Sequence, residues 1–263
     1  MDELSKITAV ILAGGLGTRL REETEFRPKP MVEVGGKPIL WHIMKNLSQQ
    51  GISNFIICTG YKGFAIKEYF LNYDAQQSDL DITLGGAQKI HYSGIRDMVN
   101  WRVSVVDTGL NTPTGGRIKA IQSLIKAENF LCTYGDGLAD INLSELFKIH
   151  KKNATIATVT SVQPYSRFGV MEISETGIVK KFREKPRVDG WVNAGFFMFN
   201  KNFFPYLNNE SVLENEPLIE LVSQGQLTAY KHNGFWQPMD TYRESLMLNQ
   251  MWDSGEAPWK NWI

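Results

Sequence analysis

The chain has 263 residues, of which 43% are apolar and 21% are charged, as in folded globular proteins and unlike disordered or fibrous ones. Lys plus Arg and Asp plus Glu both number 28, so there is no overall positive field to hold nucleic acid or an anionic membrane surface. Any phosphate binding must therefore be local. The length is near the upper limit for one hydrophobic core, which favours one domain over two independent ones.

The sequence predicts neither a membrane segment nor an export signal. Apolar runs such as Ala9–Ala13 are far shorter than the roughly 20 residues that span a bilayer. Met1–Thr8 is polar and lacks the apolar region of a signal peptide, which predicts a cytoplasmic location. Cys58 and Cys132 each lie in an apolar run, and we expect reduced core cysteines rather than a disulfide or a metal pair.

The first half of the chain alternates short β-branched runs with stretches of helical periodicity. The expected strands are Ala9–Ala13, Phe55–Thr59, Val103–Asp107 and Asn129–Thr133. The expected helices are Lys37–Gln50, Lys62–Asn72 and Gly115–Lys126. This alternation predicts an α/β fold, with a mostly parallel mixed sheet and helices on both faces. Ligands of such sheets bind beyond the carboxyl ends of the strands.

The second half places strands in closer succession, which predicts a mixed extension of the sheet. These strands are Thr155–Val162, Gly169–Ile173, Ile178–Phe182 and Val192–Phe199. Helices near Glu214–Gln224 and Tyr242–Trp252 follow, with a short strand pair between them. No repeat or flexible linker interrupts the chain, so we treat residues 1–263 as a single domain with two halves, about 1–160 and about 161–263.

A glycine-rich loop follows the first strand. Gly14, Gly15 and Gly17 leave backbone amides free to surround an anion, and Thr18-Arg19 follows with a fixed positive charge. The spacing matches neither the dinucleotide fingerprint nor the Walker lysine motif, so a plain tight turn remains an alternative.

Lys29 is the second candidate for phosphate binding. It stands between Pro28 and Pro30, which stiffen the backbone and lower the entropy lost when the lysine is presented to a triphosphate. A solvated lysine in a proline-rich turn is the alternative.

The string AVILAGGLGTRL at residues 9–20, followed by KPMVEVGGKPIL at residues 29–40, resembles the nucleotidyltransferase family that makes nucleotide sugars in a Rossmann-like fold. Five further segments resemble its glucose-1-phosphate cytidylyltransferase branch: Thr114–Arg117, Tyr134–Gly137, Phe182–Pro186, Phe235–Thr241 and Ala257–Lys260. The resemblance implies direct in-line attack of a sugar 1-phosphate, most specifically glucose 1-phosphate, on CTP. The products are a CDP-sugar (CDP-glucose) and pyrophosphate.

The resemblance also implies the two halves of the site. The nucleotide side falls in residues 1–160 and comprises Leu12, Gly14, Gly15, Gly17, Thr18, Arg19, Lys29, Arg117 and Asp136. Arg117 is implied to lie near the pyrimidine or the phosphates, with a surface arginine at a helix start as the alternative. The groups assigned to catalysis are Arg19, Lys29, Asp136 and Lys185.

Two aspartates are candidates for a Mg²⁺ site. Asp136 lies between two glycines just past a strand, and Asp240 follows Gln237-Pro238-Met239. Mg²⁺ prefers one or two carboxylates together with phosphate oxygens, and the resemblance assigns both aspartates to the metal. An aspartate between glycines is otherwise a common turn residue.

The sugar-phosphate side falls in residues 161–263, except for Tyr134. The resemblance puts Lys185 on the phosphate of the sugar and Glu184 near its hydroxyls, and an ammonium there would neutralise the attacking phosphomonoester. Charged residues at strand ends are otherwise often only solvated. Ala194 departs from the glycine that is usual in the branch. The full expected set is Tyr134, Gly169, Glu184, Lys185, Asn193 and Gly195.

Alternatives remain within and outside this class of enzyme. The same fold could use UTP or dTTP, or another phosphorylated acceptor. A binding protein without turnover belongs to a different class, and the presence of both Asp136 and Asp240 disfavours it. Members of the branch form homo-oligomers, which we also expect here. Trp252, Trp259 and Trp262 offer apolar surface for such contacts, or else pack on their own chain.

Overall fold

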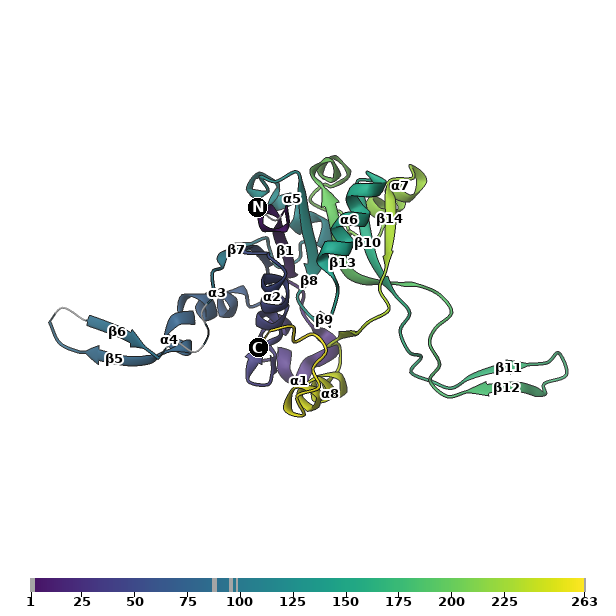
Figure 1. Cartoon of the computed structure of the whole chain (residues 1–263), viewed down its shortest axis with the longest axis horizontal. Coiled ribbons are helices and arrows are strands. Elements are labelled where there is room, and N and C mark those ends of the chain that lie inside the picture. Colours follow the sequence, from purple (N-terminus) through teal and green to yellow (C-terminus); the bar gives the residue numbers. More distant parts are fainter. Residues whose placement is uncertain (1–2, 87–88, 95–96, 98, 263) are drawn as a thin grey trace.

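The computed structural model describes residues 3–86, 89–94, 97 and 99–262. A seven-stranded sheet forms its centre, in the order β14-β10-β13-β8-β1-β4-β7 (Figure 1). The strands are β1 (Thr8–Ala13), β4 (Asn54–Thr59), β7 (Arg102–Asp107), β8 (Asn129–Tyr134), β10 (Ala157–Val162), β13 (Val192–Asn200) and β14 (Leu227–Lys231).

Most neighbouring strands of this sheet run parallel. β1 pairs in parallel with β4 and β8, β4 with β7, and β10 with β14. β13 alone runs antiparallel to both of its neighbours, β8 and β10. The mostly parallel mixed sheet predicted from the alternation of elements is confirmed, and the sheet runs without a break through both predicted halves of the chain.

Helices cover both faces because successive strand residues point to opposite sides. Ala9, Ile11 and Ala13 of β1 join one core, which is covered by α2 (Ile39–Gln49), α6 (Leu143–Asn153) and α8 (Tyr242–Asp253). Val10 and Leu12 join the opposite core, which is covered by α5 (Thr114–Ala120) and α7 (Glu216–Ser223). α5 is shorter than the helix expected over Gly115–Lys126, since a 3-10 turn at Gln122–Leu124 replaces its end.

Both cysteines lie in the second core as free, fully buried thiols, as expected. Burial raises the pKa of the Cys58 thiol to about 12, so this side chain behaves as an apolar group at neutral pH.

The smaller elements surround the sheet. The short helices are α1 (Arg21–Thr24), α3 (Gly63–Leu71) and α4 (Tyr73–Gln77), and 3-10 turns span Glu3–Lys6, Thr18–Leu20, Lys29–Met31 and Lys201–Tyr206. The short strands are β2 (Glu33–Val34), β3 (Lys37–Pro38), β9 (Gly137–Ala139) and β15 (Trp236–Pro238). Among the described helices, none is long and apolar enough to cross a membrane.

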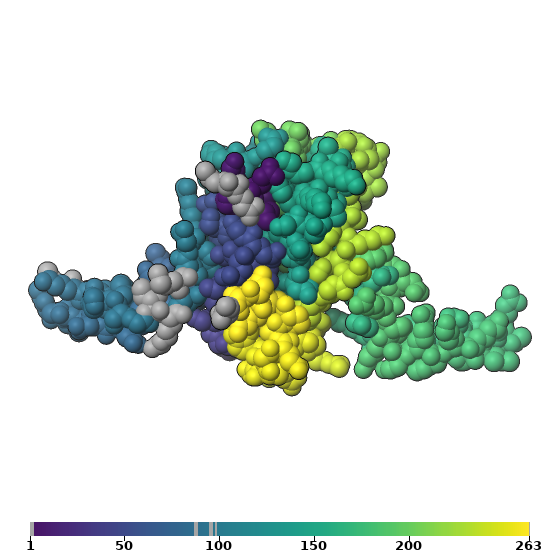
Figure 2. Space-filling view, viewed as in Figure 1, coloured from purple at the N-terminus to yellow at the C-terminus, as the bar shows by residue number. Residues whose placement is uncertain are grey.

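Two hairpins project from opposite sides of the central body (Figures 1 and 2). One pairs β5 (Asp79–Thr83) with β6 (Lys89–Ser93), and the other pairs β11 (Val170–Ile173) with β12 (Val179–Arg183). The expectation that 169–173 and 178–182 extend the central sheet was wrong. Both strands are exposed on both faces because they pair only with each other.

The expectation of a short strand pair between the last two helices was also wrong, because the two strands found there do not pair with each other. β14 pairs with β10 at the edge of the sheet, whereas β15 pairs with β9. Asp140 explains the change of direction between the two strands, since its Oδ1 accepts from Phe235 N at 2.7 Å and lies 2.9 Å from His232 Nε2.

The C-terminal tail packs on its own chain. Trp259 is fully buried, its Nε1 donates to His42 Nδ1 at 3.3 Å, and its carbonyl accepts from Asn46 Nδ2 at 2.7 Å. Of the two expectations for the tryptophan-rich tail, packing on its own chain is the one that the structure shows for Trp259.

Candidate active site

The glycine-rich loop follows β1 at the carboxyl edge of the sheet. Gly17 has a φ of +65°, and a Cβ there would lie 2.7 Å from Thr24 Cγ2, so only glycine fits without strain. Gly15 and Thr18 are exposed, and a Cβ on Gly15 would meet no atom within 4 Å. The Leu12 carbonyl accepts from Gly135 N at 3.0 Å, which fixes this loop against the residue before Asp136.

Arg117 lies beneath the loop as a buried guanidinium, 4% exposed, and not as a surface arginine at a helix start. Its side chain donates five hydrogen bonds, and burial lowers its pKa. The acceptors lie at the last residue of β4 and on the loops that follow β1 and β7: Thr59 O, Gly14 O, Thr108 Oγ1, Gly109 O and Leu110 O, at 2.7 to 3.2 Å. Arg117 therefore joins the ends of three strands of the nucleotide half.

Lys29 lies at the centre of a cluster of charges. Its side chain is 10% exposed, and Nζ lies 2.6 Å from Asp136 Oδ2 and 2.6 Å from Asp240 Oδ1. The exposed Arg19 guanidinium reaches Asp240 Oδ2 at 2.6 Å. These four residues were singled out from the sequence, and the fold brings them together. We call Arg19, Lys29, Asp136 and Asp240 the charge cluster.

Pairing of β9 with β15 explains how the two aspartates meet. Gly137 stands opposite Pro238, and Met239 N donates to Asp136 O at 2.8 Å. Each aspartate lies just outside this two-stranded ladder. Two carboxylates this close to one point repel each other unless a cation lies between them, and the Lys29 ammonium takes that position.

The cluster is compatible with Mg²⁺. Over the described part of the chain, no three His, Cys, Asp or Glu side chains gather as a cage for a metal ion. Mg²⁺ needs no such cage, because it is usually held by one or two carboxylates with phosphate oxygens and water. Two carboxylates that already converge on one ammonium fit that description.

Glu244 is a member of the site that sequence reasoning missed. Its Oε2 accepts from Asp240 N at 2.7 Å and from Thr241 N at 2.8 Å, and its Oε1 accepts from Arg167 Nη2 at 2.7 Å. Thr241 and Glu244 form a capping box at the start of α8. The spacing Thr-x-x-Glu before an apolar run was the signal that could have found it.

Glu184 and Lys185 lie where the chain leaves β12. Lys185 has a φ of +43°, a conformation that side chains other than glycine rarely adopt and that concentrates at functional sites. Lys185 Nζ is 3.8 Å from Glu184 Oε1, and both side chains are exposed. Gly169 leaves room for Phe182 and Glu184, since a Cβ there would lie 2.7 Å from the Phe182 ring and 3.1 Å from Glu184 Oε2.

The base of this hairpin is fastened to the charge cluster through α8. Ser166 N donates to Pro186 O at 2.8 Å, and the neighbouring Arg167 binds Glu244, which in turn holds Asp240 N. In the described residues no hydrogen bond or ion pair joins Lys185 to a member of the charge cluster.

Asn193, Gly195 and Tyr134 meet where β13 runs beside β8. Asn193 Oδ1 accepts from Gly195 N at 2.7 Å. Gly195 has a φ of +80°, and a Cβ there would lie 2.3 Å from a Tyr134 ring carbon, so glycine is required for this contact. Three of the residues expected on the sugar side therefore lie together, and one of them, Tyr134, stands two positions before Asp136 in the chain.

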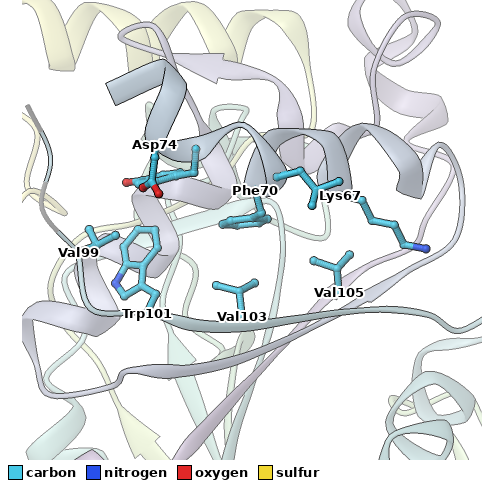
Figure 3. Close-up of a pocket in the computed structure, with 9 residues that line it drawn as sticks. Lys67, Phe70, Asp74, Val99, Trp101, Val103 and Val105 are labelled. Carbon is cyan, nitrogen blue, oxygen red and sulfur yellow. The ribbon is translucent and has the colours of Figure 1, made fainter. Parts of the chain in front are cut away.

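Two cavities lie away from this edge of the sheet. One, of about 520 Å³, opens between α3, α4 and β7, where Phe70 and Trp101 face the same space (Figure 3). The other, of about 670 Å³, is lined by residues including Glu33, Lys37 and Tyr69. Neither is lined by Lys29, Asp136 or Asp240.

A parallel sheet whose carboxyl edge carries a glycine-rich loop and a lysine between two carboxylates belongs to the α/β proteins that bind nucleotides through their phosphates. The sequence model of the family described as "Nucleotidyl transferase" matches residues 8–242. The chain belongs to this family.

Similar proteins confirm the resemblance to one branch of the family. The chain is 49% identical to the glucose-1-phosphate cytidylyltransferase of Salmonella typhi, over 97% of this chain and 99% of the relative. It is 43% identical to the "probable glucose-1-phosphate cytidylyltransferase" of Bacillus subtilis (strain 168), over the same shares.

Solved structures agree on the fold. The crystal structure of HddC from Yersinia pseudotuberculosis superposes with a TM-score of 0.69 and 23% identity, over 94% of this chain and 99% of the other. At that identity the likeness concerns the fold alone.

Proposed function

We propose that the protein catalyses transfer of CMP from CTP to α-D-glucose 1-phosphate, giving CDP-glucose and pyrophosphate. The observation that carries the proposal is the position of Lys29, 2.6 Å from both Asp136 and Asp240, beside the glycine-rich loop. The names of the relatives at 49% and 43% identity support this pair of substrates.

The nucleotide occupies the edge formed by Gly14, Gly15 and the turn of α5. Exposed amides around Gly15 and the exposed Arg19 side chain bind the triphosphate. Arg117 keeps the loops after β1, β4 and β7 in place, which supports a narrow pocket for a pyrimidine.

The reaction needs alignment and charge neutralisation more than bond-making by the protein. A phosphate oxygen of the sugar phosphate attacks the α-phosphorus of CTP in line, the bond to the β-phosphate oxygen breaks, and pyrophosphate leaves with that electron pair. Lys29 and Arg19 neutralise the triphosphate, and Lys185 neutralises the attacking phosphate. Tyr134, Glu184, Asn193 and Gly195 orient the sugar.

Asp136 and Asp240 would hold Mg²⁺, as divalent-metal use in this family suggests. A bound ion would add positive charge next to the triphosphate. Lys29, released from one carboxylate, would then be free to bind a phosphate oxygen.

Pyrophosphate release tests this function. Purified protein, Mg²⁺ and glucose 1-phosphate are mixed with CTP, UTP, dTTP, ATP or GTP in turn. Cytosine donates at position 4 where uracil and thymine accept, and a mismatched buried group costs roughly 1–3 kcal/mol. We expect CTP to be best by about 5- to 150-fold, UTP to be poor but measurable, and the purines to be inactive.

Two results would contradict the proposal at different levels. Equal specificity constants for CTP and dTTP would remove the cytidylyl assignment but not the nucleotidyl transfer. Absence of pyrophosphate with every nucleotide, while CTP still binds, would favour a binding protein without turnover.

Self-association and location are also proposals. The apolar residues of β11 and β12 are between 39% and 60% exposed, and the preceding Ile178 is 67% exposed, on a two-stranded hairpin, an element that is marginally stable alone. We propose that a second copy of the chain covers them, which makes the protein a homo-oligomer. We also propose a cytoplasmic location for the protein.

A further inference from the structure

Glu214 lies in the segment between the 3-10 turn at Lys201–Tyr206 and α7, outside every motif discussed so far. Its side chain accepts hydrogen bonds from two distant elements. Oε2 accepts from Thr114 Oγ1 at 2.8 Å, and Oε1 accepts from the Tyr134 hydroxyl. Among the described residues no lysine or arginine forms an ion pair with Glu214, so two neutral hydroxyls satisfy this exposed carboxylate.

The contact with Thr114 joins Glu214 to the nucleotide side. Leu213 N donates to Thr114 Oγ1 at 2.9 Å, and Gly116 N donates to Ser211 O at 3.0 Å. The approach is so close that a Cβ on Gly116 would lie 2.2 Å from Asn209 O. The segment before α7 is therefore fixed to the first turn of α5.

That turn carries Arg117, whose guanidinium donates to Gly14 O at 3.1 Å. A shift of α5 would move Arg117 and, through it, the glycine-rich loop. Two contacts, that of Glu214 with Thr114 and that of Arg117 with Gly14, therefore connect Glu214 to the glycine-rich loop, where the triphosphate is proposed to bind.

The contact with Tyr134 joins Glu214 to the sugar side. The Tyr134 ring packs against Gly195 and lies edge-on to Phe197, with ring centroids 6.2 Å apart. Burial, followed by the nearby Glu214 charge, raises the pKa of the Tyr134 hydroxyl, so it remains a hydrogen-bond donor at neutral pH. Gly195 N in turn holds the Asn193 side chain at 2.7 Å.

We propose that Glu214 is a positioning residue for the transfer reaction. Its carboxylate joins Tyr134, on the sugar side, to Thr114, at the start of the helix that supports the nucleotide loop, and so fixes the spacing between the two substrates. In-line transfer is sensitive to that spacing, because an error of about 1 Å in the alignment of reacting groups can cost about 100-fold in rate. The inference rests on the proposed assignment of the two substrate sides.

The test compares Glu214→Ala with the wild-type enzyme in Mg²⁺. Each substrate still meets its own side of the site, so we expect the Kd of CTP, measured by calorimetry, to stay within about twofold. Only the relative placement is lost, so kcat at saturation with both substrates should fall by about tenfold or more.

A second variant keeps the test valid if Glu214→Ala folds poorly. Tyr134→Phe keeps the ring on Gly195 and removes only the hydroxyl. If the contact with Glu214 is what the hydroxyl supplies, Tyr134→Phe alone should lower kcat and leave the Kd of CTP within about twofold. Where Glu214→Ala does fold, Tyr134→Phe should have little further effect in that background. Glu216→Ala is the control, because this neighbouring exposed glutamate begins α7 and forms no ion pair with the described residues.

The outcomes separate this inference from the site assignment. A wild-type kcat in Glu214→Ala, additive effects of the two substitutions, or a loss of CTP affinity that accounts for the whole defect would each overturn the positioning role. Asn193→Ala tests the sugar side independently, since an unchanged KM for glucose 1-phosphate would overturn that assignment instead.

Discussion

Lys29 shows how one nearly buried side chain can depend on distant parts of the fold for its charged partners. Its ammonium is nearly buried, and a buried charge is costly unless it is paired. Asp136 and Asp240 supply the pairing at 2.6 Å each, and both lie far from Lys29 in the sequence. The same arrangement that pairs the lysine with two carboxylates places it where a triphosphate is proposed to bind.

Asp136→Asn and Asp240→Asn should each reduce turnover strongly while leaving the fold intact. Each substitution removes a charged oxygen ligand for Mg²⁺ with little change in volume. Pyrophosphate release measures the loss, and the thermal midpoint checks the fold. Turnover near the wild-type rate in either variant would remove that residue from the proposed metal site.

Lys29→Ala and Lys185→Ala should each impair the use of a different substrate. Lys29 lies in the charge cluster, whereas Lys185 lies at the base of the β11–β12 hairpin. We expect the first substitution to raise the KM for CTP and the second to raise the KM for glucose 1-phosphate, each by about tenfold or more. Steady-state kinetics with each substrate varied gives the answer. An effect of Lys185→Ala on CTP alone would reverse the two assignments.

His42 should make the stability depend on pH. Burial lowers its pKa to about 4, below the usual 6.5 that applies when the chain is unfolded. The unfolded chain therefore binds a proton first, so the stabilising contribution is present above pH 6.5 and is lost as the pH falls toward 4, by on the order of 3 kcal/mol. Protonation at Nδ1 would also break the hydrogen bond from Trp259.

Thermal unfolding between pH 7 and pH 4.5 measures this effect. His42→Gln is the matched variant, because its amide can donate to Val34 O and accept from Trp259 Nε1 without titrating. We expect a smaller fall in the thermal midpoint for His42→Gln. His150 contributes to the fall of the thermal midpoint with pH in both proteins, since burial lowers its pKa to about 4 as well. If the thermal midpoint fell equally with pH in the wild type and in His42→Gln, the role of His42 would be refuted.

At the scale of elements, the start of α8 contributes both to the stability of the fold and to the geometry of the candidate active site. Its capping box satisfies backbone amides at the start of the helix, and one of those amides belongs to Asp240. The start of α8 and the position of the second aspartate are therefore fixed by the same carboxylate, Glu244.

Glu244→Ala should lower the free energy of unfolding by about 1 kcal/mol, within the range of lost caps, and should also lower kcat. Glu244→Gln keeps the capping geometry but loses the charge that faces Arg167, so we expect near wild-type stability from it. Denaturant unfolding and turnover measured on both variants check this. Equal stability of the alanine and glutamine variants would mean that the cap contributes little.

At the scale of the whole molecule, two hairpins project from the central body (Figures 1 and 2), and their described strand residues are exposed except for the half-buried Arg183. Apolar side chains on both faces of β11 and β12 create a surface that a solitary monomer would expose to water. Association of copies would bury it and would hold Lys185 and Glu184, at the end of β12, in a fixed place.

Ile178→Lys should therefore weaken self-association. A charge at this exposed position does not touch the cores of the central sheet, so the monomer should still fold. Light scattering after gel filtration, over a range of concentrations, measures the mass. We expect an oligomer for the wild type and a lower mass for the variant. A wild-type protein that is monomeric at every concentration would contradict the proposal.

The sequence by itself determined most strands and helices of the central body, because β1 is a continuous apolar run that is buried on both faces and α2 repeats apolar residues about every 3.6 positions. α6, which covers one of the two cores, was not expected from the sequence. It also indicated Gly14, Lys29, Asp136 and Asp240, because glycines, prolines and carboxylates after strands have direct chemical meaning. The β5–β6 hairpin could have been found from the alternation of polar and apolar residues over Asp79–Thr83.

Only the tertiary structure decided which of these residues meet. Pairing of β9 with β15 brings Asp240 to Asp136, and nothing local in the chain records a contact between segments so far apart. The same holds for Arg117, whose five acceptors lie at the carboxyl ends of three strands, and for Glu214, which joins α5 to β8. Local patterns reflect burial and backbone geometry, whereas contacts between distant segments depend on strand order and on the space left between packed elements.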